Sequence, residues 1–225
     1  VVATPHWIPG TSWTPTPAYI KTLVDELNKE IKKEGINLTV YPGMEIALDP
    51  KIPDLLDDGA ILTLNGESYI LIEPPFQRLP LGWEQILFEV SARNKTVLLA
   101  HAERCAQLAE TPALWDDLLA AGIYLQVNWD SFLGLLGRDV AKMACDLALR
   151  GTIHCLATDT HDVDHRNARN VQRAAAAVEK LVGLQNLRLL AQDNPEHMFR
   201  GEPLKVMDRG VIRGKPNKRR VWKIW

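Results

Sequence analysis

Residues 156–166, which read LATDTHDVDHR, join an apolar strand to two side chains of metal-ligand type. The stretch begins inside residues 153–157, a run whose length and boundaries are typical of a buried strand. Asp159 and His161 follow the carboxyl end of that strand, and residues two apart project on the same side of an extended segment. Such a pair can bind one cation, although an isolated pair is more often part of a solvated turn or an ion pair.

The same order, an apolar run followed by a His or an acidic residue, recurs along the chain. The four further residues at such positions are His6, Glu45, Glu73 and His101. Between these runs the apolar residues recur at helical spacing, for example over residues 17–35, 113–121 and 140–149. Strands that alternate with helices predict an α/β fold with parallel strands, and a closed or nearly closed barrel in particular. In such barrels the reactive residues lie at the carboxyl ends of several strands.

One short segment predicts a different local structure. Residues 61–64 and 68–72 flank the dipeptide Asn65-Gly66. Because the favoured two-residue hairpin turn needs positive φ at both central positions, Asn-Gly predicts a β-hairpin here.

Composition limits the class of protein. A chain of 225 residues with 46% hydrophobic residues suits one main domain, which we place at residues 1–200, and a basic tail at 201–225. The net charge of −2 gives no reason to expect nucleic acid as a partner. Three cysteines without a C-x-x-C pair favour a reduced, cytoplasmic protein, and no apolar run approaches the ~18 residues of a membrane span. Because Val1 looks like the interior of a strand, we expect residues to be missing upstream.

The six residues at strand ends form a donor set with a defined metal preference. It contains three imidazoles, three carboxylates and no thiolate, which suits manganese, iron or zinc. Six donors exceed the needs of one ion, so we expect two or three cations ~3.5 to 4 Å apart, an arrangement that acts on phosphoryl groups. Taken singly, Glu45 could instead be an ordinary surface acid, and His101 could instead be a hydrogen-bonded histidine of the core.

Two arginines follow proposed ligands closely. Arg104 lies three residues past His101, and Arg166 lies five past His161. A guanidinium group matches the oxygens of a phosphate, although a surface salt bridge is an equal alternative for each. The loop aromatics Trp7, Trp13 and Phe76 have two interpretations as well, stacking on an aromatic substrate or, more commonly, packing of the loop.

Five motifs together resemble one protein superfamily. They are ATPH at 3–6, PGMEI at 42–46, YILIE at 69–73, LAHAER at 99–104 and ATDTH at 157–161. They resemble the PHP (polymerase and histidinol phosphatase) superfamily, and more closely its bacterial capsule- and exopolysaccharide-regulating branch of manganese-dependent protein-tyrosine phosphatases (CpsB/YwqE-like). The resemblance implies a distorted β/α barrel with a trinuclear site that binds Mn²⁺. It also implies roles for eight residues, with His6, Glu45, Glu73, His101, Asp159 and His161 as metal ligands and Arg104 and Arg166 as phosphate-binding residues.

The chain departs from the pattern of this branch in three places. The D-x-H-x-H strand that opens the family is absent, so we expect this chain to lack the first strand and helix of the barrel. Ala102 replaces the usual Pro of the H-P-E-R run. Thr158 and Thr160 stand where Ser and Ala are common.

The implied function is hydrolysis of phosphotyrosine in proteins by a metal-activated hydroxide. A thiolate mechanism needs an Arg six residues after the cysteine, and Cys105, Cys145 and Cys155 have Thr, Gly and His there. By analogy the substrate is a bacterial tyrosine autokinase that controls exopolysaccharide synthesis. Two alternatives remain, a phosphatase of a small ester such as histidinol phosphate and an inactive binding module. The basic end, residues 215–225, has two interpretations. It could contact an anionic membrane or an acidic partner, or it could be a disordered solubilising tail.

Overall fold

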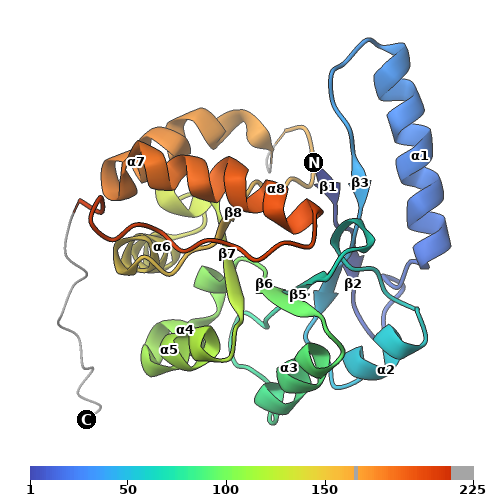
Figure 1. Cartoon of the computed structure of the whole chain (residues 1–225), viewed down its shortest axis with the longest axis horizontal. Coiled ribbons are helices and arrows are strands. Elements are labelled where there is room, and N and C mark those ends of the chain that lie inside the picture. The colour runs from blue at the N-terminus through green and yellow to red at the C-terminus, as the bar shows by residue number, and fades with distance from the viewer. Residues whose placement is uncertain (165–166, 214–225) are drawn as a thin grey trace. The chain divides into compact units, whose positions relative to one another are not determined.

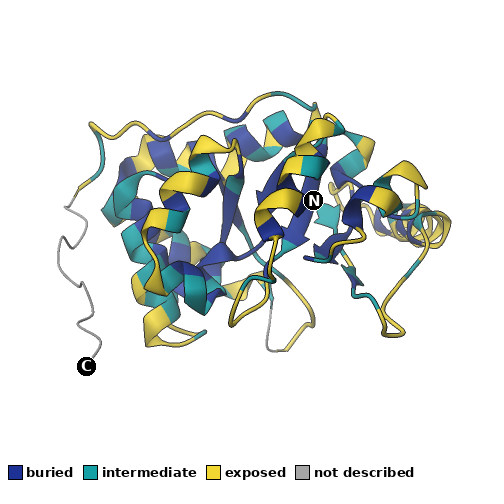
Figure 2. Cartoon of the chain, turned by 90° about the horizontal axis from the view of Figure 1, so that it is seen from below, coloured by how far each residue is buried: buried dark blue, intermediate teal, exposed yellow. Residues whose placement is uncertain are grey.

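The computed structural model describes residues 1–164 and 167–213 (Figure 1). These residues form two compact units. The first unit comprises Val1–Tyr124 and Glu196–Pro203, and the second comprises, of the described residues, those of 125–195 and 204–213. In both units the strands are largely buried, whereas exposed residues gather on the helices and loops (Figure 2). No helix in the described part of the chain has the length and apolar character that a bilayer crossing requires.

Parallel strands form the centre of the first unit. Four of them pair in the order β2-β4-β5-β6, and β1 pairs separately with β3. The strands are β1 (Val2–Ala3), β2 (His6–Trp7), β3 (Tyr41–Pro42), β4 (Glu45–Ala47), β5 (Tyr69–Glu73) and β6 (Thr96–Leu99). The helices of this unit are α1 (Pro17–Lys33), α2 (Ile52–Asp57), α3 (Trp83–Ala92), α4 (Ala106–Glu110) and α5 (Ala113–Ala120), with 3₁₀ turns at Leu64–Gly66 and Ala102–Arg104. The predicted α/β class with parallel strands is confirmed.

Strands β5 and β6 are buried apolar segments, each followed by a polar residue. Tyr69, Ile70, Leu71 and Ile72 are all buried, as expected for a parallel strand with both faces covered. Glu73 follows them directly, and β6 similarly ends in three buried leucine and valine positions before His101. Because parallel strands all end at the same edge of a sheet, polar residues that follow neighbouring strands are brought together there.

Helix α1 begins where the sequence predicts. Thr16 caps it, because its hydroxyl oxygen accepts a hydrogen bond from the backbone N–H of Tyr19 at 3.3 Å, and Pro17 occupies the first helical position. Lys32 and Lys33 lie in the last turn, where cations interact favourably with the helix dipole.

The hairpin predicted around Asn65-Gly66 is wrong. Both residues do adopt positive φ, 56° and 77°, but they belong to a 3₁₀ turn, and residues 61–63 form no strand. The reason lies in the sheet, since β5 is paired with β4 on one edge and β6 on the other. No hydrogen-bonding edge remains for an antiparallel partner.

The second unit contains two parallel strands and long helices. Its elements are β7 (Tyr124–Asn128), whose residues from Leu125 on belong to it, α6 (Arg138–Arg150), β8 (Cys155–Ala157), α7 (Val171–Arg188), a π-helical turn (Leu189–Asp193) and the start of α8 (Asn194–Phe199), with 3₁₀ turns at Trp129–Leu133 and Ala168–Asn170. In the register of β7 and β8, Asn128 lies opposite Ala157.

The region predicted as a tail packs on α7 over its described part. Leu204 and Met207 are buried, the Asn186 side chain exchanges two hydrogen bonds of 2.8 Å with the backbone of Asp208, and the Arg213 N–H donates to the carbonyl of Leu181. The division at residue 200 stays a prediction, and residues 215–225 lie outside the described part of the chain.

His154 makes the second unit sensitive to pH. It is 4% exposed, its Nδ1 accepts a hydrogen bond from the N–H of Leu125 at 3.2 Å, and burial lowers its pKa to about 4. Below pH 6.5, the ordinary pKa of a histidine, His154 binds a proton in the unfolded chain but stays neutral in the folded chain until the pH approaches 4. The free energy of unfolding therefore decreases as the pH falls.

We expect a shift from pH 7 to pH 5 to lower the free energy of unfolding by roughly 2 kcal/mol more in the wild type than in His154→Asn. The asparagine can keep an acceptor near Nδ1 and does not titrate. Urea unfolding of both proteins at both pH values measures the difference, and equal losses would contradict the assignment to His154.

Candidate metal centre

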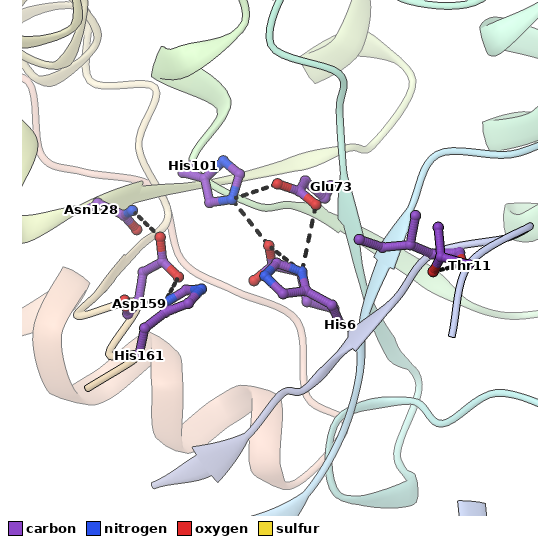
Figure 3. Close-up of polar contacts among 9 residues, drawn as sticks. His6, Thr11, Glu73, His101, Asn128, Asp159 and His161 are labelled. Carbon is purple, nitrogen blue, oxygen red and sulfur yellow. Dashed lines mark hydrogen bonds and ion pairs between the residues drawn. The ribbon is translucent and has the colours of Figure 1, made fainter. Parts of the chain in front are cut away.

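Four of the predicted ligands, His6, Glu45, Glu73 and His101, lie together in the first unit. Figure 3 labels three of them, His6, Glu73 and His101. His6 is the first residue of β2, Glu45 the first of β4 and Glu73 the last of β5, while His101 comes two residues after β6 ends. His6 and Glu45 are direct partners in the register of β2 and β4. Side chains from four neighbouring strands therefore reach one place.

The distances among these side chains are short enough for a shared cation. His101 Nε2 lies 3.0 Å from Glu45 Oε1 and 3.4 Å from Glu73 Oε1. His6 Nδ1 lies 3.7 Å from Glu45 Oε1 and 3.6 Å from Glu73 Oε2. One donor atom each of His6, Glu45 and Glu73 lies within 4.8 Å of the other two. Two carboxylates and imidazole nitrogens at this spacing are suitable ligands for a divalent cation of intermediate hardness.

The electrostatics of the cluster favour positive charge between the two carboxylates. Burial alone would lower the pKa of His101, but its hydrogen bonds to Glu45 and Glu73 outweigh burial and raise the pKa to about 9. Burial alone would raise the pKa of Glu73, but the hydrogen bond and charge of His101 lower it. A histidine binds metal in its neutral form, so a divalent cation would displace this proton and take over its role.

Two of the predicted ligands hold an uncommon backbone conformation. His101 has φ 29° and Asp159 has φ 50°, and positive φ is uncommon for residues other than glycine. Each lies two residues past the end of a strand, β6 for His101 and β8 for Asp159. Such conformations persist where the surrounding structure fixes them, and they cluster at functional sites.

Arg104 lies beside this cluster in the same unit. It ends the 3₁₀ turn that follows His101, and its N–H donates to the His101 carbonyl at 2.9 Å. Its guanidinium carbon lies 4.3 Å from the centre of the Phe76 ring, which in turn lies 5.9 Å from the His101 ring. Arg166, the second predicted phosphate-binding residue, lies outside the described residues.

The remaining two predicted ligands form a pair in the second unit. His161 Nδ1 lies 2.9 Å from the backbone oxygen of Asp159 and 3.4 Å from its Oδ1 (Figure 3). The Asp159 side chain is 7% exposed and that of His161 is 35% exposed. Both are therefore held next to each other, with the carboxylate the more buried.

The sequence analysis did not single out Asn128, which orients Asp159. Its side-chain nitrogen donates to Asp159 Oδ2 at 2.8 Å, and its side-chain oxygen accepts from Gln126 Nε2 at 2.6 Å. Asn128 and Gln126 are 1% and 4% exposed. Asn128 could have been found from its position, because it is the last residue of a strand, as Glu73 is. An amide side chain indicates a metal site less strongly than a His or an acid does.

The cysteines are poor candidates for nucleophiles. All three are free thiols; Cys105 and Cys155 are buried and Cys145 is half-buried. Burial raises the pKa of each, for Cys155 to about 12. The reactive form of a cysteine is the thiolate, which these environments disfavour.

Residues 1–200 match the family model described as capsular polysaccharide synthesis, CpsB/CapC. The chain belongs to this family. The CpsB/CapC chain is 32% identical over 204 residues to "Tyrosine-protein phosphatase YwqE" of Bacillus subtilis, a match that covers 91% of this chain and 79% of that protein. It is 29% identical over 168 residues to "Putative tyrosine-protein phosphatase CapC" of Staphylococcus aureus, covering 74% of this chain and 65% of the relative.

A solved structure has the same fold as this CpsB/CapC chain. It is described as YwqE from Bacillus subtilis and CpsB from Streptococcus pneumoniae, metal-dependent tyrosine phosphatases. The TM-score is 0.86 with 31% identity, and the match covers 97% of this chain and 85% of that one. The predicted family is thus confirmed, and the likeness agrees with the predicted fold class, a distorted β/α barrel.

The donors of the CpsB/CapC chain fit a divalent metal. His6, Glu45 and Glu73 meet the spacing of a metal site, and Glu45 and Glu73 raise the pKa of His101, as carboxylates that favour a positive charge between them do. Nitrogen and oxygen donors without sulfur are compatible with manganese, iron and zinc alike. The assignment of the six individual residues as ligands stays a prediction.

Proposed function

We propose that this chain is a metal-dependent protein-tyrosine phosphatase that hydrolyses phosphotyrosine with two or three divalent cations, Mn²⁺ first among them. The observation that carries the proposal is the cluster of His6, Glu45, Glu73 and His101, because its donors suit the metal dependence named for the matching structure. The remaining proposed ligands are Asp159 and His161, the pair in the second unit.

The reaction class is hydrolysis of a phosphomonoester. The oxygen of water forms a bond to phosphorus, the bond from phosphorus to the tyrosyl oxygen breaks, and the phenolate takes up a proton. Bound divalent cations would supply Lewis acidity, which is worth several kcal/mol of charge stabilisation, and would lower the pKa of water. No covalent intermediate on the protein is needed, which agrees with the protonated state of Cys105, Cys145 and Cys155.

The residues of the chain hold the other reaction partners in place. Arg104 presents a planar set of N–H donors beside the cluster, and we propose that it binds the non-bridging oxygens of the phosphoryl group. Asn128 holds the Asp159 carboxylate in one orientation, as is common for metal-ligating carboxylates. Arg166 is proposed as a second phosphate-binding residue on the family resemblance.

The proposed substrate is a tyrosine-phosphorylated protein, specifically the bacterial tyrosine autokinase of a capsule or exopolysaccharide system. The support is the family description, which concerns capsular polysaccharide synthesis, and the names of the two relatives. A cytoplasmic location is part of the same proposal and is supported by the three free thiols.

Turnover measurements with matched substrates test the proposal. Phosphate release is measured with a phosphotyrosine peptide and with histidinol phosphate, on the chain together with any residues that its coding region places before Val1. We expect faster turnover of the peptide, complete loss with a chelator and recovery with Mn²⁺. Preference for histidinol phosphate would indicate the small-ester alternative. Failure to bind metal and to release phosphate from either compound would indicate the inactive binding module.

A further inference from the structure

The loop after β5 carries an aromatic residue that the proposed reaction leaves without a role. Phe76 is 46% exposed, although it is a large apolar side chain. Its neighbours are Arg104, whose guanidinium lies 4.3 Å from the ring centre, and His101, whose ring lies at 5.9 Å and 43°. Phe76 therefore contacts a proposed phosphate-binding residue and a proposed metal ligand while half of its surface stays open.

Hydrogen bonds fix the loop in this position. The Phe76 carbonyl accepts from the N–H of Ala106 at 2.8 Å, and the Gln77 carbonyl accepts from the N–H of Gln107 at 3.0 Å. The side-chain oxygen of Gln107 also accepts from the N–H of Leu79 at 2.8 Å. The loop is thus attached to the start of α4, directly after the turn that carries Arg104, and the two side chains keep their mutual position.

The chemistry of a phosphate ester places its organic group next to this ring. Phosphoryl oxygens held by Arg104 leave the ester oxygen and its substituent beside the guanidinium, where Phe76 lies. Aromatic rings pair favourably at centroid distances of about 4.5–7 Å, so a phenyl substituent gains a contact here that an alkyl substituent does not. We propose that Phe76 is a specificity-determining residue that selects esters with an aromatic leaving group, an inference that rests on the proposed phosphatase function.

The test compares two substrates in one set of variants. Phenyl phosphate and a simple alkyl phosphate are assayed with wild type, Phe76→Ala, Phe76→Tyr and Phe76→Leu. We expect Phe76→Ala to lower kcat/KM for phenyl phosphate by about three- to tenfold, mainly through KM, and that for the alkyl ester by less than about twofold. Phe76→Tyr keeps a ring and should restore the preference, whereas Phe76→Leu keeps an apolar side chain without a ring and should not.

Two further variants make the result specific. Phe88→Ala removes another exposed phenylalanine, 67% exposed on α3, and should change neither substrate. Trp13→Ala removes the aromatic residue that lies 5.9 Å from His6, and a selective loss there with Phe76→Ala unchanged would overturn the proposal.

Equal losses for both substrates in Phe76→Ala would also overturn it, since Phe76 would then only hold Arg104. Circular dichroism and metal content of each variant confirm that fold and cations are retained. Wild-type protein that releases phosphate from neither compound would instead contradict the proposed function, so the two failures are distinguishable.

Discussion

Replacing Glu45 by glutamine is expected to lower kcat for a phosphotyrosine peptide by at least about a thousandfold, because bound cations contribute several kcal/mol to phosphoryl transfer. Glu45 is 5% exposed, and one of its oxygens lies 3.0 Å from His101 and 3.7 Å from His6. Glutamine keeps the size of the side chain and removes its charge. The variant should bind fewer Mn²⁺ ions per chain by elemental analysis, and its activity should not return at saturating Mn²⁺.

The matched control for this experiment is Glu84→Gln, which removes an exposed carboxylate from the first turn of α3. It should keep wild-type activity and metal content. A folded Glu45→Gln protein that turned over within tenfold of wild type would contradict the placement of Glu45 in the metal centre.

Replacing Arg104 by lysine is expected to lower kcat/KM by roughly a hundredfold, the size of effect seen when one oriented donor to a developing charge is lost. Lysine keeps the positive charge but not the planar set of donors, and it cannot cover the Phe76 ring as the guanidinium does at 4.3 Å. Metal content should be unchanged, which separates this effect from the loss at Glu45. Steady-state kinetics together with elemental analysis measure both quantities.

Arg200→Ala is the control for the arginine series, since the Arg200 side chain is 62% exposed and pairs loosely with Glu196 at 4.0 Å. It should leave kcat/KM unchanged. If kcat/KM of Arg104→Ala were close to that of wild type, the phosphate-binding role would be contradicted, whatever the kcat/KM of Arg104→Lys.

The architecture of the first unit was predictable because parallel strands carry a local signature. The buried runs of β5 and β6 are apolar along their whole length, and the polar residues that follow them mark the edge where they end. The failed hairpin shows the limit of this reasoning. Asn65-Gly66 fixed the turn, but the partner of β5 was decided by β4 and β6, which lie far away in the sequence.

The candidate site was predictable to the same degree and for the same reason. His6, Glu45, Glu73 and His101 could be named because each follows an apolar run, and the structure brings them together. Glu73 and His101 do lie at or just past a strand end, whereas His6 and Glu45 each begin a short strand. The hydrogen bond from Asn128 to Asp159 could not be derived, since residues 31 positions apart meet only through the pairing of β7 with β8. The contact of Arg104 with Phe76 likewise depends on the bonds between two loops, which leave no pattern in the sequence.

The protonated thiols have a consequence for the conditions under which such an enzyme works. Peroxide inactivates an enzyme with a thiolate nucleophile because the anion is readily converted to sulfenic acid. Here burial keeps Cys105, Cys145 and Cys155 in the form that resists this attack. A phosphatase without a catalytic thiolate would not lose activity by this route under oxidative stress, whereas thiol-based phosphatases are inactivated.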